Sequence, residues 1–135
     1  MAAHSPLRLV LVTPETTLID EPVSALRFPL FDGQIGILPG RAPLIGRLGY
    51  GELNVTHVDG SHASYFVDGG FVQVKQGIVS LLTDRALTSE QIDPAAAEEK
   101  LREASARKAH SDAEINARFR DEERARQMLA LADRR

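Results

Sequence analysis

The sequence predicts an α+β protein, with an N-terminal antiparallel β-sandwich, or flattened barrel, over residues 1–87 and a C-terminal antiparallel two-helix hairpin over residues 88–135. All ten glycines lie at or before Gly77, and six of the seven prolines lie at or before Pro43. The chain before Pro94 holds 35 Val, Ile, Leu, Met, Phe and Tyr residues, whereas the chain from Pro94 onward holds only six. Turn residues and core residues are therefore concentrated in the first part, which predicts one core there and a helical appendage after it.

The first part consists of short runs rich in β-branched and aromatic residues, separated by turn signals. The clearest hairpin spans residues 52–68, with Asp59-Gly60 at its tip as a two-residue turn. Gln76-Gly77 marks a second turn. Short strands joined by turns, with no helix between them, indicate antiparallel pairing. The predicted strands cover residues 7–13, 23–28, 34–38, 52–58, 62–67, 70–75 and 78–84.

The second part is rich in Ala, Glu, Arg and Lys, which are strong helix formers. Asp93 followed by Pro94 is an N-cap with proline at the first helical position. Ser111 and Glu114 have the spacing of a capping box, which opens a second helix. The break between the two helices is short, so they are expected to run antiparallel. The predicted helices cover residues 94–109 and 111–132.

The hairpin has too few apolar residues to form a core of its own. Its apolar stripe, made by Ile115, Phe119 and Leu129, is interrupted by Glu122 and Arg126 at same-face positions. The hairpin must therefore settle on the sandwich or on a partner. Two interpretations remain open, namely an element that detaches and a helical pair that packs weakly on one site.

Composition excludes several classes of function. The formal net charge of −3 is nearly balanced, so no general attraction to nucleic acid or to an anionic membrane follows from it, and we expect no nucleic-acid partner. The absence of cysteine excludes disulfides, thiolate zinc sites and a cysteine nucleophile, and fits a reducing cytoplasmic setting. No run of about 18 apolar residues and no obvious secretion signal occurs, so we do not expect a membrane-spanning chain.

Potential metal ligands cluster only in the segment H-V-D-G-S-H. With a two-residue turn at Asp59-Gly60, His57 and His62 would lie opposite each other on one face, close enough to share a metal ion. Two histidines are two ligands short of a closed site, so a plain polar hairpin tip is the alternative. The sequence contains no phosphate-binding loop and no nucleophile elbow. We therefore expect no catalytic site, no metal and no cofactor.

Arginines gather on the second predicted helix. They are Arg118, Arg120, Arg124 and Arg126, with Arg134 and Arg135 at the end of the chain. The chain from Pro94 onward carries ten Lys or Arg and nine Asp or Glu, so a solvated face with local ion pairs is one interpretation. Contact with an acidic partner is the other.

Three segments, taken in order, carry a family pattern. They are G-Q-I-G-I-L-P-G-R-A-P-L-I-G-R-L at 33–48, Y-F-V-D-G-G-F-V-Q-V-K-Q-G-I-V-S-L-L-T-D-R-A at 65–86 and Q-I-D-P-A-A-A at 91–97. With them, and with its change from sandwich to helical hairpin, the chain resembles the epsilon subunit of bacterial F-type ATP synthases, whose mitochondrial counterpart is called delta. The resemblance covers essentially the whole chain.

The resemblance implies a noncatalytic subunit of the rotating central stalk, at the cytoplasmic face of the inner (plasma) membrane. In this family the sandwich binds the gamma subunit and rests on the ring of membrane c subunits, which links the two for proton coupling. The C-terminal helices switch between a folded and an extended form. The extended form reaches the catalytic alpha/beta hexamer and inhibits ATP hydrolysis.

By position, the resemblance implies three sets of contact residues. The c-ring contacts would be Asp32, Gln34, Ile35, Leu38 and Arg41. The gamma contacts would be Thr13, Arg41 and Pro43. The arginines that face the acidic segment of the beta subunit would be Arg118, Arg120, Arg124 and Arg126. Gln34 stands where many members carry an acidic residue, and Arg41 where they often carry histidine.

One departure concerns ATP. Members that bind ATP on the hairpin carry I/L-D-x-x-R-A, whereas residues 92–97 here read I-D-P-A-A-A, with Ala96 in the arginine slot. A further arginine of the second helix falls on Met128, although Arg124 aligns. Because alanine cannot replace a bidentate guanidinium partner of phosphate, we expect weak or no ATP binding.

Two other classes were weighed beside a stalk subunit. A free-standing β-sandwich binding module would use the pair His57 and His62 for a small ligand. An enzyme would need a convergent acid, base and nucleophile, and the sequence has no such set.

Overall fold

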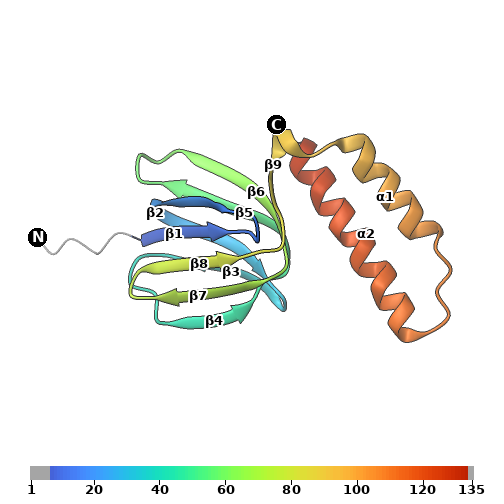
Figure 1. The fold of residues 1–135 in the computed structure, drawn as a ribbon, viewed down its shortest axis with the longest axis horizontal. Helices are drawn as coiled ribbons and strands as arrows, with labels where there is room; N and C mark the ends of the chain where they lie inside the picture. Colours follow the sequence, from blue (N-terminus) through green and yellow to red (C-terminus); the bar gives the residue numbers. More distant parts are fainter. Residues whose placement is uncertain (1–6, 134–135) are drawn as a thin grey trace, which may run out of the picture.

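The chain folds into a β-sandwich that is followed by a two-helix arm, which confirms the predicted fold class (Figure 1). The computed structural model describes residues 7–133, so Arg134 and Arg135 lie outside the described residues. The elements are β1 (Leu7–Val12), β2 (Thr17–Leu30), β3 (Gly33–Ile37), β4 (Leu44–Arg47), β5 (Tyr50–His57), β6 (His62–Asp68), β7 (Phe71–Lys75), β8 (Ile78–Leu82), β9 (Ala86–Thr88), the 3-10 helix η1 (Ser89–Gln91), α1 (Pro94–Ala106) and α2 (Asp112–Asp133).

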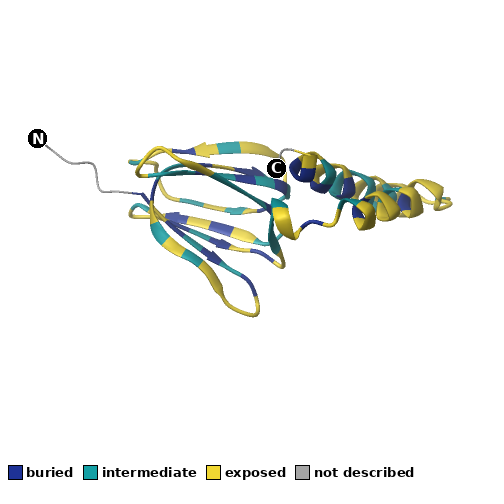
Figure 2. Cartoon of the chain, turned by 90° about the horizontal axis from the view of Figure 1, so that it is seen from above, coloured by how far each residue is buried: buried dark blue, intermediate teal, exposed yellow. Residues whose placement is uncertain are grey.

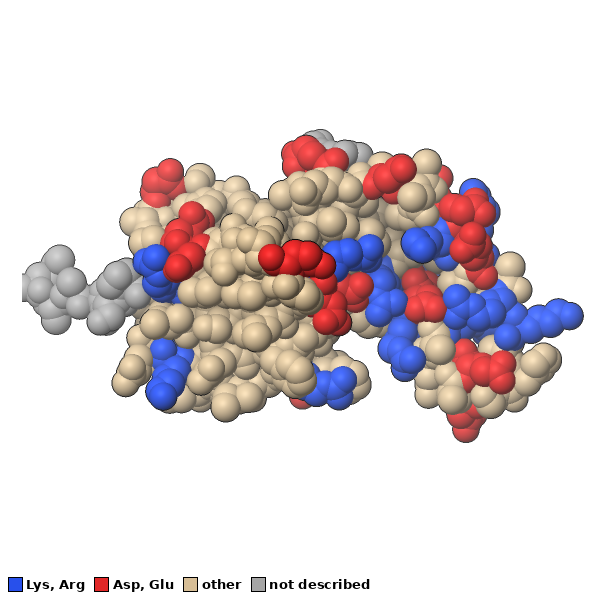
Figure 3. Space-filling view, viewed as in Figure 1, with Lys and Arg blue, Asp and Glu red and all other residues tan. Residues whose placement is uncertain are grey.

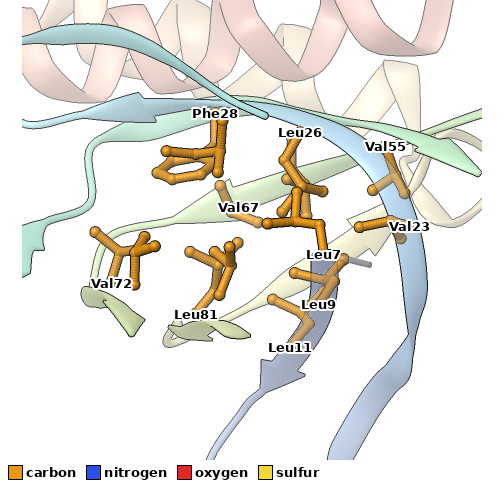
Figure 4. Packing of buried hydrophobic residues seen from close by; sticks show 14 of the residues in the cluster. Leu7, Leu9, Leu11, Val23, Leu26, Phe28, Val55, Val67, Val72 and Leu81 are labelled. Carbon is orange, nitrogen blue, oxygen red and sulfur yellow. The ribbon is translucent and has the colours of Figure 1, made fainter. Parts of the chain in front are cut away.

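The strands form one continuous sheet that folds over into two layers. Its order is β4-β7-β8-β1-β2-β5-β6-β9, with β3 paired to β2. The long strand β2 belongs to both layers, because its first half pairs with β1 and its second half pairs with β5 and β3. The register shifts between Val23 and Ala25, where the strand bends around the core (Figure 4). All described pairings are antiparallel except β1 with β8, which is parallel.

The main core lies between the two layers and contains only sandwich residues (Figure 4). It includes the fully buried side chains of Leu9, Phe28, Ile37, Val55 and Leu81. The alternation of buried and exposed residues along β7 and β8 sends Val72, Val74, Val79 and Leu81 inward. The sandwich therefore holds its own hydrophobic core without the hairpin.

The strand prediction missed three pieces of the sheet. β4 and β9 are short edge strands of four and three residues, and their pairing with β7 and β6 is a tertiary contact with little local signal. The first half of β2 was also missed, because Asp20, Glu21 and Pro22 are depleted in strands. Its pairing with β1 overrides that preference.

The expected two-residue turn at Asp59-Gly60 is wrong by one residue. Gly60 N–H donates to His57 O (2.9 Å), and His57 N–H donates to Ser61 O (2.7 Å). Only Gly60 has positive φ (90°) at this tip, and Asp59 Oδ1 instead accepts hydrogen bonds from the Ser61 N–H and hydroxyl. The tip is a β-turn followed by a glycine bulge, which shifts the strand register by one position. The turn at Gln76-Gly77, with φ of 53° and 79°, is confirmed.

The two helices begin as predicted and run antiparallel (Figure 1). Asp93 Oδ1 accepts hydrogen bonds from the N–H groups of Ala95 and Ala96. The Ser111 hydroxyl accepts a hydrogen bond from the Glu114 N–H, which is the N-cap bond of the predicted capping box, and it donates to the Glu114 carboxylate. α1 stops at Ala106, three residues short of the predicted end, because the next residue already has extended backbone angles. Figure 2 shows the hairpin as an arm beside the sandwich, exposed over most of its surface.

Candidate functional site

A small second apolar cluster docks the hairpin on the sandwich. Its buried members are Phe66, Ile92, Ala97, Met128, Leu131 and Ala132, and Tyr50, Leu87 and Leu129 pack against them. Phe66 comes from β6, whereas Met128 and Leu131 come from the C-terminal half of α2. Ile115 and Phe119, in the N-terminal half of α2, stay 44% and 59% exposed. Only the C-terminal end of the predicted apolar stripe of α2 therefore packs against the second apolar cluster.

A chain of alternating charges also joins the hairpin to the sandwich. We call it the ion-pair chain, and its members are Arg85, Asp68, Arg124, Asp121 and Arg107. Arg124 donates to Asp68 Oδ1 through Nε (2.8 Å) and to Asp121 Oδ1 through Nη1 (2.9 Å). Arg107 donates to Asp121 Oδ2 (2.8 Å), and Arg85 lies 3.5 Å from Asp68 Oδ2. The ion-pair chain thus connects β6, α2 and the end of α1.

The environment of the ion-pair chain shifts the pKa of two of its groups. The hydrogen bond from Arg107 lowers the pKa of Asp121 below its ordinary value, and Arg124 adds to this effect. Burial opposes the charged form of Arg124, but its contacts with Asp68 and Asp121 raise its pKa overall. The Arg124 guanidinium also lies 5.2 Å from the ring centroid of Tyr50, in a cation–π contact.

The four predicted arginines of α2 differ in their surroundings. Arg124 belongs to the ion-pair chain. Arg118 lies 3.9 Å from Glu122 and donates to the backbone oxygen of Arg107, and Arg126 pairs with Glu122 and Glu123 in its own helix. The Arg120 side chain makes neither an ion pair nor a hydrogen bond with any described residue. Three of the four arginines therefore form ion pairs within the chain, and contact of the cluster with an acidic partner stays a prediction.

A cleft of about 390 Å³ lies between the two helices and the sandwich, and its lining includes Arg124 and Met128, two positions of the ATP-binding pattern. Its three arginines, Arg85, Arg107 and Arg124, all pair with carboxylates of the chain itself. Ala96 lies exposed at the start of α1, and Met128 is buried in the second apolar cluster. The geometry offers no uncommitted guanidinium at these positions of the described hairpin.

The predicted c-ring residues lie in a strip along β3 and the turn after it. Asp32, Gln34, Leu38 and Arg41 are exposed, whereas Ile35 is partly buried against the main core. Arg41 N–H donates to Leu38 O (3.3 Å) across a turn with Gly40 at φ 88°. Leu38 is 65% exposed at this turn. Ile35 therefore faces the core, whereas Leu38 faces solvent.

The predicted gamma residues lie beside an apolar sheet surface that the sequence reasoning did not single out. We call this surface the outer sheet face, and it consists of Ile45, Phe71, Ile78 and Leu82 on β4, β7 and β8, which are 78%, 59%, 44% and 51% exposed. Phe71 and Leu82 are directly paired across the ladder. The sequence signal for this face is that β7 and β8 carry apolar residues at adjacent positions, such as Phe71 and Val72 or Leu81 and Leu82. Adjacent residues of a strand point to opposite faces of the sheet, so this pattern indicates strands that are covered on both faces.

Grooves connect the outer sheet face to the predicted gamma residues. A groove of about 280 Å³ contains Thr13, Phe71 and Leu82 in its walls. A second, of about 500 Å³, contains Pro43 and Ile45. The Thr13 side chain is itself buried and its hydroxyl donates to Thr16 O (3.3 Å), whereas Pro43 is exposed.

The expected pairing of His57 with His62 is wrong, because the glycine bulge shifts the register. Thr56 lies opposite His62, with 3.2 Å between Thr56 Oγ1 and His62 Nδ1. His57 Nδ1 instead lies 3.2 Å from Glu21 Oε1. Within residues 7–133, no group of three or more His, Asp or Glu side chains is placed to hold a metal ion.

The fold combines a β-sandwich that has an uncovered apolar sheet face with a docked helical arm, and an exposed apolar face of this kind is typical of proteins that bind other proteins. Comparison with known families agrees with this class. A model of the β-sandwich domain of the ATP synthase delta/epsilon chain matches residues 6–89. The chain belongs to the ATP synthase delta/epsilon chain family, as the sequence motifs indicated, and its family role is that of a noncatalytic subunit.

Individual relatives extend the match to as much as 94% of the chain. The ATP synthase epsilon chain of Rhodopirellula baltica is 47% identical over 98 residues, which are 73% of this chain and 76% of that one. The epsilon chain of a Synechococcus species is 36% identical over 129 residues, covering 94% and 93% of the two chains.

Two solved structures resemble this fold. A chain of the mitochondrial ATP synthase of Euglena gracilis (OSCP/F1/c-ring) aligns with a TM-score of 0.84 and 26% identity, over 96% of this chain and 83% of that chain. A chain from the central stalk and c-ring of the Tetrahymena thermophila mitochondrial ATP synthase has the same fold, with a TM-score of 0.74 at 12% identity and coverage of 97% and 99%. In residues 7–133 neither helix is both long and apolar enough to cross a membrane.

Proposed function

We propose that this chain is a rotor subunit of the central stalk of a proton-translocating F-type ATP synthase, bound peripherally at the cytoplasmic face of the inner membrane. Its sandwich links gamma to the c ring, and its hairpin acts as a brake on ATP hydrolysis. The observation that carries the proposal is the outer sheet face, on a chain whose family assembles into this machine. Four large exposed apolar side chains on adjacent strands are costly to leave in water and favour a permanent partner.

The outer sheet face is the proposed gamma contact. Pro43 is exposed and lines a groove with Ile45, and Arg41 is exposed two residues before Pro43. Thr13 lines a second groove with Phe71 and Leu82. Because the Thr13 side chain is buried, its part in the contact is to fix the turn after β1. The apolar area of Phe71 and Leu82 is expected to supply most of the affinity.

The strip along β3 is the proposed c-ring contact. Asp32, Gln34, Leu38 and Arg41 offer exposed side chains there, and Ile35 anchors the strand to the core beneath them. With a neutral amide at Gln34, this contact depends less on charge than a contact made by an acidic residue.

The proposed brake is a change in population between a docked and an extended hairpin. The division between residues 1–87 and 88–135 supports such a change, because the main core contains no hairpin residue. Arg120 is already uncommitted when the hairpin is docked, and undocking would release Arg124 from Asp68. These arginines, with Arg118 and Arg126, would then meet acidic groups of the alpha/beta hexamer.

ATP is not expected to act on this hairpin. The exposed Ala96 and the buried Met128 replace guanidinium groups, and carboxylates already occupy Arg107 and Arg124. Calorimetry of the isolated protein should therefore detect no micromolar binding of ATP, and a micromolar dissociation constant would contradict this part of the proposal.

The test is a truncation assayed in the assembled synthase. Deleting residues 94–135 keeps β9 and η1 and leaves the main core intact. We expect the truncated chain to copurify with gamma and to support proton coupling, while ATP hydrolysis rises. Unchanged hydrolysis would count against the brake. A chain that is monodisperse and ignores gamma would contradict the stalk role and favour a free-standing binding module.

A further inference from the structure

A second open surface lies between the sandwich and the hairpin. A cleft of about 620 Å³ is bounded by the turn after β2 on one side and by the first half of α2 on the other. Phe31 lies in the sandwich wall and is 68% exposed, and Phe119 lies in the α2 wall and is 59% exposed. We call it the Phe31–Phe119 cleft. Its volume lies in the range of binding pockets, with two aromatic side chains that the chain itself does not cover.

The charged groups of this cleft that form no ion pair with any described residue are two arginines and one aspartate, so their sum is positive. Arg47 lies over the Phe31 ring, 4.7 Å from its centroid, and the Phe31 N–H donates to Arg47 O (2.9 Å), which fixes the two together. Neither Arg47 nor Arg120 on the opposite wall has a carboxylate partner among residues 7–133. Asp68 is engaged by the ion-pair chain, which leaves Asp84 as the exposed acidic group of the lining. Figure 3 shows Lys and Arg side chains, with Asp and Glu side chains among them, between the sandwich and the hairpin.

We infer that the Phe31–Phe119 cleft receives an acidic segment of a neighbouring protein in the assembled synthase. An aromatic or leucine side chain of that segment lies between Phe31 and Phe119, and a carboxylate pairs with Arg47 or Arg120. Guanidinium groups without a carboxylate, set beside exposed aromatic rings, fit such a segment in both charge and apolar character. The inference rests on the proposed membership in the stalk, and it adds a surface to those proposed for gamma and the c ring.

The occupant has a consequence for the hairpin. The two walls belong to different parts of the chain, so a segment that contacts both binds only the docked form. Binding to one of two states shifts the population toward that state. The occupied cleft therefore holds the hairpin on the sandwich and keeps the brake off.

A rival explanation is that Phe119 is exposed only because the extended hairpin uses it elsewhere. That explanation gives no role to Phe31 and Arg47, which belong to the sandwich and stay there when the hairpin leaves. A change on the sandwich wall therefore separates the two explanations.

The chain contains no cysteine, so a single introduced cysteine reports the cleft. Asn116 lines the cleft and is exposed, and Asn116→Cys keeps both phenylalanines and both arginines. We expect maleimide to alkylate this cysteine at least about tenfold more slowly in the purified, assembled complex than in the isolated protein, since occupancy must exceed about 90%. Glu98→Cys, exposed on α1, is the control and should react at similar rates in both.

Changes on the sandwich wall complete the test. Arg47→Glu or Phe31→Ser, added to Asn116→Cys, should restore fast alkylation in the complex, whereas Arg47→Lys should keep the protection. A benzophenone maleimide on Asn116→Cys should crosslink to a segment that contains Asp or Glu. The inference is overturned if Asn116→Cys reacts equally fast in both states, if its protection ignores Arg47 and Phe31, or if the crosslinked segment has no acidic residue. Copurification of gamma with every variant shows that the stalk role survives whichever result is obtained.

Discussion

Arg124 is expected to control how firmly the hairpin is docked. Arg124→Met removes its bonds to Asp68 and Asp121 but keeps an aliphatic side chain against Tyr50. The side chains of Arg124 and Asp68 are 32% and 19% exposed. A fully exposed ion pair stabilises a protein by about 0.2–1 kcal/mol, and breaking a buried one costs about 3–5 kcal/mol. The pair of Arg124 with Asp68 should lie between these two ranges. Arg85 remains 3.5 Å from Asp68 and limits the loss. We therefore expect docking to weaken by about 2 kcal/mol, or about thirtyfold in the ratio of docked to undocked hairpin.

Native-state hydrogen exchange measures this ratio directly. The hairpin has little apolar core of its own, so its helices are marginal when undocked and their amides exchange through the undocked state. Protection along the C-terminal half of α2 should fall about thirtyfold in Arg124→Met, while β1 and β8 amides keep their protection. Arg126→Met is the matched control, because Arg126 pairs only within α2, and it should cost only about 0.5 kcal/mol. Equal effects of the two variants, or unchanged protection in Arg124→Met, would refute the role of the ion-pair chain.

Three further predictions concern the hairpin and the sandwich. Leu131→Ala should destabilise docking by about 2–4 kcal/mol, seen as loss of α2 protection with the sandwich unchanged, since Leu131 is 3% exposed in the second apolar cluster. The hydrogen bond from Arg107 lowers the pKa of Asp121, so its stabilisation is complete above the unfolded pKa of about 4 and is lost as pH falls through the lower folded pKa. Helical circular dichroism should therefore be constant from pH 5 to 8 and fall only in acid; a loss near pH 6 would contradict this. Gly70→Ala should lower the free energy of unfolding of the sandwich by about 3 kcal/mol or more, measured by denaturant unfolding. The φ of Gly70 is 111°, and an added Cβ would lie 1.8 Å from a β8 carbonyl oxygen. Gly36→Ala is the control and should cost less than half as much, because no atom lies nearer than 3.9 Å to its added Cβ.

Features written in local sequence could be predicted well. The N-cap at Asp93 and the bond from the Glu114 N–H to the Ser111 hydroxyl depend on only a few neighbouring residues, and both are present in the structure. The turn at Gln76-Gly77 is equally local. At Asp59-Gly60 the local signal allowed two solutions, and the side chain of Asp59 favours the one with a bulge because it caps Ser61. A difference of one residue in that loop was enough to separate His57 from His62.

Features that depend on distant segments could not be predicted in the same way. The ion-pair chain joins Asp68 to Arg124, which lie 56 positions apart in the sequence. The residues that flank each of them do not indicate that the two will pair. The resemblance to relatives pointed to Arg124 for a different reason, as part of a cluster. The outer sheet face was visible as apolar residues on both sides of β7 and β8, but only the pairing of Phe71 with Leu82 shows that they form one surface.

The nature of the docking contact bears on how the hairpin could leave. A large apolar interface would make undocking costly, because every buried square ångström would have to be rehydrated. Here the second apolar cluster is small, and much of the specificity comes from charges that water solvates well once they are released. A contact of this kind can have a well-defined geometry even though the docked and undocked states of the hairpin differ little in free energy. Ionic strength then becomes a test of the balance, since about 1 M salt shortens the Debye length to about 3 Å and weakens partly exposed pairs while leaving apolar contacts intact. If α2 protection falls with salt in the native chain but not in Arg124→Met, the ion-pair chain sets the docking equilibrium; if both respond alike, the apolar cluster does.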